Sequence, residues 1–350
     1  MFKNTDRNYY FMKVERVIMK KKELIERWET DPEWINRRKE ILSVLVSSNS
    51  QQKYVQSDMR GLTIAETNMR SPWIKGKVFE GIDFSYSDFS HCRIERCTFR
   101  SCIFHYTNFM DITEVNCEFW DCAFYKGKMN GWIGLWGSFY SNVTFDQIKL
   151  SSITMFHPDF ENCQFINCNL KRTEFNGAIL NNVKIVGLVS DVKFKGRYIL
   201  NDITLPEDFD AGRMYKLNPM IVDFSRAEIT YCMFTHDCDL TKVILPKDGK
   251  YYLIKNKIAV KEYTEAFCGR LKDDEKIYLD WILDIFLHLY EGNNMDILNL
   301  QDWYDSMIKN GAKEKDAQTI LQKLVNELKD QGYIDGENGK KIPHSRDARY

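Results

Sequence analysis

Large apolar side chains recur at every fifth position through the middle of the chain. An α-helix has a period of about 3.6 residues and a simple strand a period of two, so neither produces this spacing. The series misses at Glu114 and Gly134, shifts by one residue between Phe139 and Phe145, and breaks beyond Ile185. Its members are Met59, Ile64, Met69, Ile74, Phe79, Phe84, Phe89, Ile94, Phe99, Phe104, Phe109, Phe119, Phe124, Met129, Phe139, Phe145, Leu150, Met155, Phe160, Phe165, Leu170, Phe175, Leu180, Ile185, Phe224, Ile229, Phe234, Leu240 and Leu245. A period held this long predicts a stack of short repeats.

A second series, of small side chains, precedes the large ones by two positions. It consists of Ser87, Cys92, Cys97, Cys102, Thr107, Cys117, Cys122, Cys163, Cys168, Thr173, Ala178, Ala227, Cys232 and Cys238. Because alternate residues of a strand point to opposite faces, the small and large positions share the interior, and the residue between them faces solvent. Four such sides close one turn of a square solenoid, and successive turns stack at about 4.8 Å. We therefore expect ladders of Phe and of Cys down the interior.

The repeats resemble those of the pentapeptide-repeat family. The motif of that family is roughly A(D/N)LXX, with Cys, Ser, Thr or Val tolerated at the first place and Phe at the third. The matching segments are CTFRS, CIFHY, TNFMD, CEFWD, CAFYK, CQFIN, CNLKR and TEFNG. The resemblance covers about residues 55–246, and it implies an all-β solenoid, a right-handed quadrilateral β-helix.

Both ends of the chain have a different pattern, which is typical of helices. Near the N-terminus apolar residues recur at intervals of three and four, and Pro32 follows the helix-capping candidates Thr30 and Asp31. We expect residues 1–54 to form a helical cap, because a bare solenoid end exposes an apolar cross-section and unpaired backbone. After a short strand or hairpin in DGKYYLIKN, residues 247–350 predict a mainly helical domain with a polar, disordered tail.

One segment of the C-terminal domain loosely resembles a winged helix-turn-helix. Between Leu298 and Ile334, a short helix, a glycine-containing turn and a longer helix precede GYIDGENGKKI. Such a domain would bind DNA through the helix that carries Gln318, Gln322 and Lys323. However, acidic residues exceed basic ones by two in the C-terminal domain, whereas DNA-binding domains are basic. We therefore favour a helical cap or partner-docking domain over direct nucleic-acid binding.

The sequence carries no familiar catalytic motif. There is no HExxH, GxxxxGK[ST], GxSxG or GxGxxG, and the six histidines are scattered. Nine of the ten cysteines occupy the small interior position, where residues five apart fall on successive sides of the square and do not converge on a metal. They are better explained as small buried fillers. We therefore expect no enzyme activity, no metal and no cofactor, and any pocket should come from irregular segments.

Three irregular segments are candidates for function, because loops on a rigid scaffold often carry it. Glu114 occupies a large apolar position, and the desolvation cost of a buried carboxylate predicts a bulge that turns it outward. The segment NGWIGLWGSFY, residues 130–140, has three glycines and two tryptophans where a repeat should be. Between residues 186 and 222 the period fails altogether. The candidate partner-binding residues in or near these segments are Asp111, Glu114, Glu118, Asp121, Asp202, Glu207, Asp208 and Asp210.

Two functions remain open. The first is a non-enzymatic interaction or scaffold module that binds an unknown protein through its flat faces or end domains. The second follows from the resemblance, since some pentapeptide-repeat proteins mimic DNA and bind DNA gyrase or topoisomerase IV. Such mimicry needs a strongly acidic face, whereas acidic residues exceed basic ones by only three between residues 71 and 245. We therefore favour the interaction module.

Charge and hydropathy indicate which binding partners and which cellular location to expect. The net charge of −1 predicts no general attraction to nucleic acid or to anionic membranes. No apolar run approaches the roughly 18–20 residues that a membrane-spanning helix needs, and the N-terminus lacks the pattern of a secretory signal. We therefore expect a soluble cytoplasmic protein. Because both ends carry caps, we expect a monomer or a weak homodimer.

Overall fold

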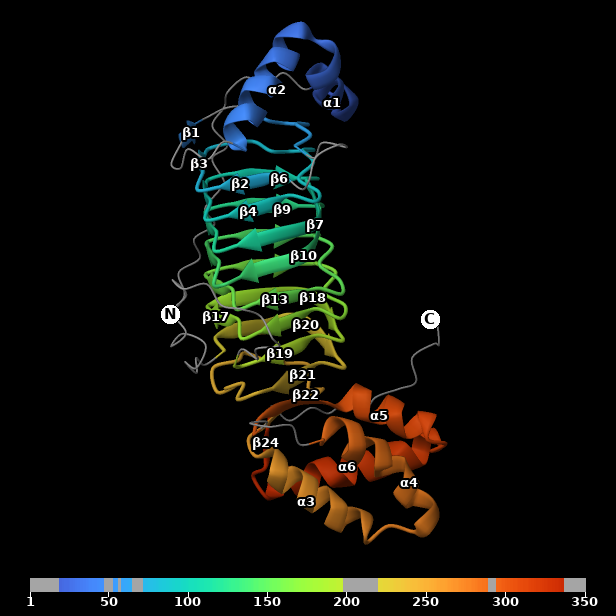
Figure 1. Ribbon diagram of the computed structural model, residues 1–350. Helices are drawn as coiled ribbons and strands as arrows, with labels where there is room; N and C mark the ends of the chain where they lie inside the picture. The colour runs from blue at the N-terminus through green and yellow to red at the C-terminus, as the bar shows by residue number, and fades with distance from the viewer. Residues whose placement is uncertain are drawn as a thin grey trace.

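The computed structural model describes residues 19–46, 53–55, 58–64, 72–197, 220–288 and 294–336. A column of stacked parallel strands stands between a pair of helices at one end and a mainly helical unit at the other (Figure 1). The β-solenoid with helical ends that the sequence predicts is therefore confirmed.

Three parallel sheets form three sides of the solenoid. The seven-stranded sheet contains β1 (Lys53–Val55), β3 (Val78–Glu80), β5 (Thr98–Arg100), β8 (Glu118–Trp120), β11 (Phe139–Ser141), β14 (Asp159–Glu161) and β17 (Ile179–Asn181). The eight-stranded sheet contains β2 (Trp73–Lys75), β4 (Arg93–Glu95), β7 (Asn108–Val115), β10 (Lys128–Leu135), β13 (Thr154–Phe156), β16 (Glu174–Asn176), β19 (Lys193–Lys195) and β21 (Met233–Thr235). The six-stranded sheet contains β6 (Ile103–His105), β9 (Ala123–Tyr125), β12 (Thr144–Asp146), β15 (Gln164–Ile166), β18 (Val183–Ser190) and β20 (Val222–Thr230). Isolated bridges, such as Asp88 to Asn108, join the coils on the fourth side.

Stacked residues are 20 positions apart in the regular coils, as four sides of five residues require. Phe79 pairs with Phe99, and Phe99 pairs with Phe119. Their ring centroids lie 4.9 and 4.8 Å apart, with the rings nearly parallel. The large inward positions therefore form the aromatic ladder that the five-residue period predicts. Burial of these rings and their stacking supply much of the cohesion between coils.

The interior thiols satisfy their hydrogen-bonding groups within the stack. Cys97 Sγ lies 3.6 Å from the carbonyl oxygen of Ile74, and Cys117 Sγ lies 3.5 Å from that of Ile94. Each of these carbonyls belongs to the preceding coil. Burial raises the pKa of the Cys163 thiol to about 12, so this group stays protonated near neutral pH. The cysteines thus fill the small inward positions of the solenoid.

The corners of the solenoid use a left-handed backbone conformation. Twenty-two non-glycine residues of the described chain have positive φ angles, from 47° at Asn116 to 64° at Tyr86. Most of them lie two residues after a large inward side chain. Asn and Asp adopt this conformation more readily than other non-glycine residues. This geometry favours acidic side chains at corners, including Asp111 and Asp121.

Replacing Ser101 by valine should lower the free energy of unfolding by about 1–2 kcal/mol, because a β-branched side chain is strained in the left-handed region. Ser101 is an exposed corner residue with a φ of 52°. The matched control is Ser101→Gly, which relieves the strain and should leave stability nearly unchanged. Urea denaturation of the two variants measures the difference. An equal loss in both variants would show that the corner conformation is not responsible.

Two helices, α1 (Lys21–Thr30) and α2 (Pro32–Leu45), cap the N-terminal end of the solenoid. Asp31, one of the two capping candidates, caps α2 with its side chain. The Arg27 guanidinium donates two hydrogen bonds to the carboxylate of Asp58, at 2.9 and 3.0 Å. Trp28 Nε1 donates to the carbonyl oxygen of Arg60 at 2.8 Å. These contacts join the helices to the first described coil.

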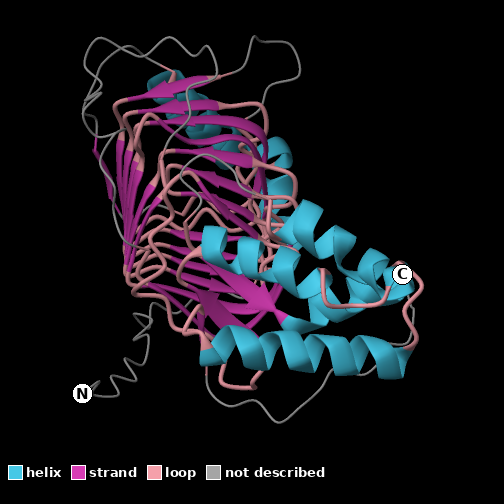
Figure 2. Ribbon diagram, turned by 90° about the horizontal axis from the view of Figure 1, so that it is seen from below, coloured by secondary structure: helices cyan, strands magenta, loops and turns pink. Residues whose placement is uncertain are grey.

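The C-terminal unit combines a small antiparallel sheet with helices, and Figure 2 shows those helices projecting beyond one side of the solenoid's end. Its sheet has the order β23 (Asp296–Asn299), β22 (Tyr251–Ile254) and β24 (Ile334–Asp335). Its helices are α3 (Lys257–Cys268), α4 (Asp273–Trp281), which continues as a π-helical turn η2 (Ile282–Phe286), α5 (Leu300–Lys309) and α6 (Glu314–Asp330). None of the helices in the described part of the chain is long and apolar enough to cross a membrane.

This unit covers the open edge of the last coil. Asp302 Oδ2 accepts a hydrogen bond from the backbone N–H of Tyr231 at 2.7 Å, and Asn299 Nδ2 donates to the carbonyl oxygen of Ile229 at 2.7 Å. The Tyr251 hydroxyl accepts from the N–H of Ile229 at 3.1 Å. An uncovered strand edge is a template for association with other chains, so these bonds end the solenoid.

Two details of the repeat pattern differ from the sequence prediction. Tyr140, and not Phe139, is the inward residue of β11, since it stacks between Phe119 and Phe160 at 4.9 and 4.8 Å. The extra residue therefore lies before Phe139. Regular coils also continue beyond residue 186, through the rest of β18 and through β19. Only the later part of the expected break, residues 198–219, lies outside the described residues.

Candidate functional site: a groove on the eight-stranded sheet

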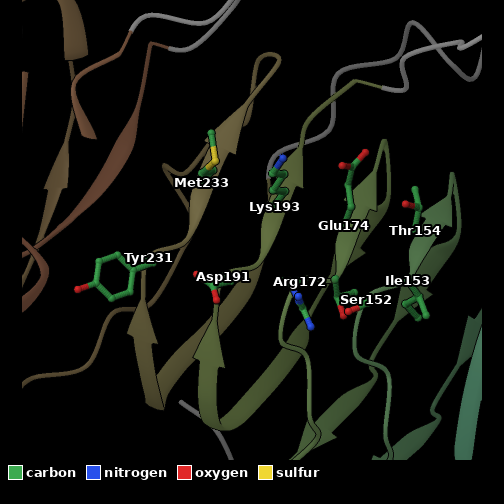
Figure 3. Close-up of a pocket in the computed structure, with 10 residues that line it drawn as sticks. Ser152, Ile153, Thr154, Arg172, Glu174, Asp191, Lys193, Tyr231 and Met233 are labelled. Carbon is green, nitrogen blue, oxygen red and sulfur yellow. The ribbon is translucent and has the colours of Figure 1, made fainter. Parts of the chain in front are cut away.

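A groove of about 670 Å³ runs along the outside of the eight-stranded sheet, and its two walls are rows of side chains from successive coils (Figure 3). One wall consists of the corner residues Ser152, Arg172, Asp191 and Tyr231. The other consists of the first residues of four strands, Thr154, Glu174, Lys193 and Met233. Ile153 and Thr173, both buried, lie between the walls. Because coils stack at about 4.8 Å, four coils give the groove a length of about 14 Å.

The repeat itself holds the walls in place. Each corner residue has the left-handed backbone, with φ values of 59° at Ser152, 60° at Arg172, 54° at Asp191 and 50° at Tyr231. The opposite wall begins two residues later, where the strand turns its side chains outward. The groove therefore rests on the hydrogen-bonded backbone of regular coils.

The four charged side chains of the groove are not equivalent. Glu174 Oε1 forms an ion pair with Lys195 Nζ at 2.6 Å, and Asp191 Oδ2 lies 3.9 Å from Lys171 Nζ. Both lysines lie outside the residues that line the groove. Arg172 and Lys193, in contrast, have no acidic partner within the described residues. The groove therefore presents two unneutralised cations, one on each wall.

The C-terminal unit closes one end of the groove at Tyr231. The ring of Tyr231 stacks against Phe286, with a distance of 6.2 Å between centroids. Lys309 Nζ lies 5.8 Å from the centroid of the Tyr231 ring. A third cation thus lies near the closed end. This arrangement favours a ligand with negative charge along its length.

The lining offers binding groups but little for catalysis. The Thr173 hydroxyl already donates to the carbonyl oxygen of Leu150 at 2.7 Å. Cys232, between Tyr231 and Met233, is held by burial at a pKa of about 12, so its thiol is a poor nucleophile. The ten lining residues include no histidine.

The acidic residues singled out from the sequence are not brought together. Asp111 lies at an exposed corner within β7, 3.6 Å from His91 Nδ1. Glu118 lies on β8 of the seven-stranded sheet and accepts a hydrogen bond from Trp120 Nε1 at 3.1 Å. Asp121 occupies the next corner. Spread over different sides of the coil, they do not form a row of charges that would imitate the phosphates of DNA.

Glu114 contradicts the expectation that it turns outward. Its side chain is in the core, with 3% of its surface exposed. The carboxyl accepts hydrogen bonds from the N–H of Gly134 at 2.6 Å and from the Tyr140 hydroxyl at 2.8 Å, and also from the Ser138 hydroxyl. Burial raises the pKa of Glu114 above the ordinary carboxyl range. The desolvation cost is met by hydrogen bonds and a proton rather than by a bulge that exposes the group.

The irregular segment supplies all three of these hydrogen-bond donors. In β10, Trp132 and Leu135 pair with Thr113 and Val115, so two residues of β10 lie opposite the single residue Glu114. This bulge brings the N–H of Gly134 to the carboxyl. The glycine-rich irregularity of residues 130–140 therefore serves the core of the solenoid, where it supplies the partners of Glu114. The other predicted site residues, Asp202, Glu207, Asp208 and Asp210, lie outside the described residues.

The segment that resembles a winged helix has the expected helices, but its charges do not suit DNA. In α6, Gln322 and Lys323 are exposed, and Gln322 Nε2 donates to Asn326 Oδ1 at 2.8 Å. Gln318 is partly buried on the same helix. The acidic residues of α6, Glu314, Asp316, Glu327 and Asp330, outnumber its basic residues, Lys315, Lys323 and Lys329. A recognition helix is expected to carry the opposite balance.

Sequence reasoning did not find the groove, and its expectation that a pocket would come from irregular segments was wrong. The walls consist of residues from regular coils. Along the corner wall, for example, Ser152, Arg172 and Asp191 follow one another at intervals of 20 and 19 residues. Arranging the sequence by coil, rather than along the chain, would have placed Arg172 beside Lys193. The charge partners Lys171 and Lys195 could not have been assigned in this way, since they depend on side-chain geometry.

Comparison with known proteins agrees with the repeat pattern. The family described as pentapeptide repeats matches in eight copies, over residues 76–113 and 159–187. Among solved structures, a trypsin-treated form of QnrB1, a plasmid-mediated fluoroquinolone resistance protein, is 11% identical, with 53% of this chain and 91% of that chain covered and a TM-score of 0.30. HetL, a pentapeptide repeat protein involved in heterocyst differentiation regulation from the cyanobacterium Nostoc sp. strain PCC 7120, is 11% identical, with coverages of 61% and 96% and a TM-score of 0.23. No curated protein matches the sequence.

Proposed function

This chain is a pentapeptide-repeat protein, and we propose that it is a non-enzymatic binding module whose groove accepts an extended, anionic segment of a partner protein. The observation that supports this proposal is the pair of cations, Arg172 and Lys193, that face each other across the groove without an acidic partner in the described residues. A scaffold that only filled space would gain nothing from leaving both cations unneutralised while neighbouring carboxylates are paired.

The dimensions of the groove fit a peptide. A length of about 14 Å corresponds to about four residues of extended chain at about 3.3 Å each. The volume of about 670 Å³ lies in the range of ligand-binding clefts. Carboxylate or phosphate groups on such a segment would lie between Arg172 and Lys193, and the ring of Tyr231 would contact its apolar part. Arginine suits this role, since its planar guanidinium pairs with either anion through two hydrogen bonds.

A double charge reversal, Arg172→Glu with Lys193→Glu, should weaken the binding of an acidic peptide by about tenfold or more, which corresponds to about 1.4 kcal/mol. The probe is a fluorescein-labelled peptide of eight glutamates, titrated with the full-length protein and followed by polarisation. Binding should also weaken as salt is raised, because both contacts are charged and solvent-exposed.

The matched control reverses two exposed lysines on the fourth side of the solenoid, Lys128→Glu with Lys149→Glu. It changes the net charge by the same amount, so it separates a local effect from a general one. Equal losses in the two double variants, or an acidic peptide that binds no better than a lysine peptide, would contradict the proposal. The same three proteins, used as baits in cytosolic extract, then identify a partner as one retained by wild type and control but lost by the groove variant.

A further inference from the structure

The helix formed by α4 and η2 exposes a row of large apolar side chains. Ile277, Trp281 and Ile285 are spaced four residues apart, so they lie along one side of the helix. Their exposed fractions are 53%, 46% and 53%. The opposite side is already used, since Leu279 and Ile282 are fully buried in the core of the C-terminal unit. The apolar row is therefore additional to the residues that hold the fold together.

A row of carboxylates flanks the apolar row. Asp280 and Asp284 are both exposed and precede Trp281 and Ile285 by one residue each, so they lie along one margin of the row. Like charges four residues apart repel on a helix surface, which weakens the helix by itself. Between Asp273 and the end of η2 the only basic residue is Lys276, which is paired with Asp273 at 2.6 Å.

From this pattern we infer that the exposed face of α4 and η2 docks an amphipathic helix of a partner protein, one with an apolar stripe and lysine or arginine along one flank. The apolar stripe would cover Ile277, Trp281 and Ile285, in the manner of a helix laid on an apolar surface. The basic flank would lie against Asp280 and Asp284 and remove their mutual repulsion. Trp281, at the centre of the row, has the residue type and position of a binding hot spot.

A second copy of this chain does not suit the surface. In a parallel pairing of two copies, the two carboxylates would gain no cation, because the only basic residue of the helix, Lys276, is already paired with Asp273. In an antiparallel pairing, the twofold axis places each margin against its own counterpart. Asp280 and Asp284 of one copy would then face the same two residues of the other, and like charges would meet at the contact. The negative margin therefore selects a positively charged partner and disfavours association of identical chains.

The test uses an 18-residue helical peptide with leucine along one face and lysine along one flank, labelled with fluorescein and titrated with the full-length protein. A second peptide carries glutamate in place of every lysine. We expect the lysine peptide to bind, the glutamate peptide to bind at least tenfold more weakly, and Trp281→Ala to weaken the lysine peptide by about tenfold. The double variant Asp280→Lys with Asp284→Lys should reverse the preference between the two peptides.

Ile244→Ala provides a matched control, because Ile244 is 48% exposed but lies on the solenoid. It should leave peptide binding unchanged. Circular dichroism and the melting temperature should be the same for all variants, since the substituted side chains are exposed. The inference is overturned if neither peptide binds, if both bind equally, or if the charge reversal leaves the preference unchanged. It is also overturned if light scattering shows a dimer that Trp281→Ala dissociates.

Discussion

Raising the pH from 5 towards 9 should destabilise the solenoid, and the variant Glu114→Gln should lack that part of the dependence. Burial raises the pKa of Glu114 above the ordinary carboxyl value of 4.5. In the unfolded chain the carboxyl has its ordinary pKa. At pH values between the two, the folded protein retains a proton that the unfolded chain has released. The free energy of unfolding therefore falls as the pH rises, by about 1.4 kcal/mol per pH unit while the folded carboxyl stays protonated.

The direction of the pKa shift follows from the surroundings of the Glu114 carboxyl. Hydrogen bonds from Gly134, Ser138 and Tyr140 favour the charged form, but desolvation is the larger effect and favours the neutral form. The stabilising contribution is complete below the ordinary carboxyl pKa and is lost as the pH rises through the folded pKa. The same burial, followed by the neighbouring carboxyl, holds the pKa of Tyr140 well above its ordinary value. The tyrosine therefore remains a hydrogen-bond donor over the whole range.

Glutamine matches the neutral acid in shape and in bonding. Its amide oxygen can accept from the N–H of Gly134 and the hydroxyl of Tyr140, and its amide nitrogen can donate to Ser138 Oγ. Glu114→Gln should therefore stay within about 1 kcal/mol of wild type at pH 5 and become the more stable protein at high pH. Glu114→Leu fills the same space but leaves buried donors without an acceptor, so it should lose about 3–5 kcal/mol at pH 5. Its deficit should shrink as the pH rises, because only the wild type then loses the contribution of the protonated carboxyl.

Urea denaturation of the three proteins at intervals from pH 5 to pH 9 measures these differences. The difference between wild type and Glu114→Gln cancels the titration of other groups, since these are common to both. Parallel curves for the two proteins would mean that Glu114 is already ionised in the folded state at pH 5. A Glu114→Leu protein as stable as wild type would mean that the donors find other acceptors.

The five-residue period was enough to predict the solenoid, because each coil packs only on its neighbours and the interior positions follow from the strand alternation. The outcome at Glu114 could not be predicted in the same way. Its hydrogen-bond donors lie 20 to 26 residues further on, in the next coil. They reach the carboxyl only because two residues of β10, Ile133 and Gly134, lie opposite the single residue Glu114 of β7. The rule that carboxylates avoid the core considers only the residue itself, and it does not take into account donors from the next coil.

The choice between Phe139 and Tyr140 shows a second limit. Two adjacent aromatic residues both fit a large inward position, so the period alone cannot place the extra residue. The structure places it between Leu135 and Phe139, because Leu135 pairs with Val115, 20 positions earlier, whereas Phe139 pairs with Glu118, 21 positions earlier. In and just before this stretch, Gly131, Gly134 and Gly137 adopt positive φ angles of 108°, 71° and 83°. A Cβ on Gly131 would lie 2.2 Å from the carbonyl oxygen of Ile112, so the close approach of the two strands requires glycine there. Glycine spacing was thus the better indicator of the bulge.

The groove, too, could not be predicted from the local sequence, because it is formed by residues of adjacent coils. The walls are regular positions of regular repeats, and any single repeat looks unremarkable in the sequence. The binding role proposed for them depends on which side chains stack in adjacent coils and on which carboxylates are already paired. The stacking partners can be predicted by aligning the sequence coil by coil. The ion pairs cannot, because they depend on side-chain positions. Sequence alone therefore predicts the scaffold well and the binding surface poorly.

Removing one partner of the buried ion pair between Lys257 and Asp296 should loosen the C-terminal cap while the solenoid stays folded. Lys257 Nζ and Asp296 Oδ2 are 2.5 Å apart, and both side chains are buried. The pair joins the start of α3 to the start of β23. Asp296→Ala would remove the carboxylate that lies 2.5 Å from this buried ammonium group. We expect a loss of about 3–5 kcal/mol in the stability of the cap.

The double variant Lys257→Met with Asp296→Leu is the informative control. It removes both charges together and fills the same space with apolar atoms, so it should cost far less than Asp296→Ala and could be neutral. Limited proteolysis is the measurement, because a loosened cap is cut within residues 250–336 while the strands of the solenoid stay protected. A cap equally resistant in wild type and Asp296→Ala would show that the contacts of Asn299 and Asp302 with Ile229 and Tyr231 hold the unit without the ion pair. If the protease cuts the single and double variants equally fast, the ion pair itself stabilises the cap. In that case the loss in Asp296→Ala does not come from keeping Lys257 buried after its carboxylate is removed.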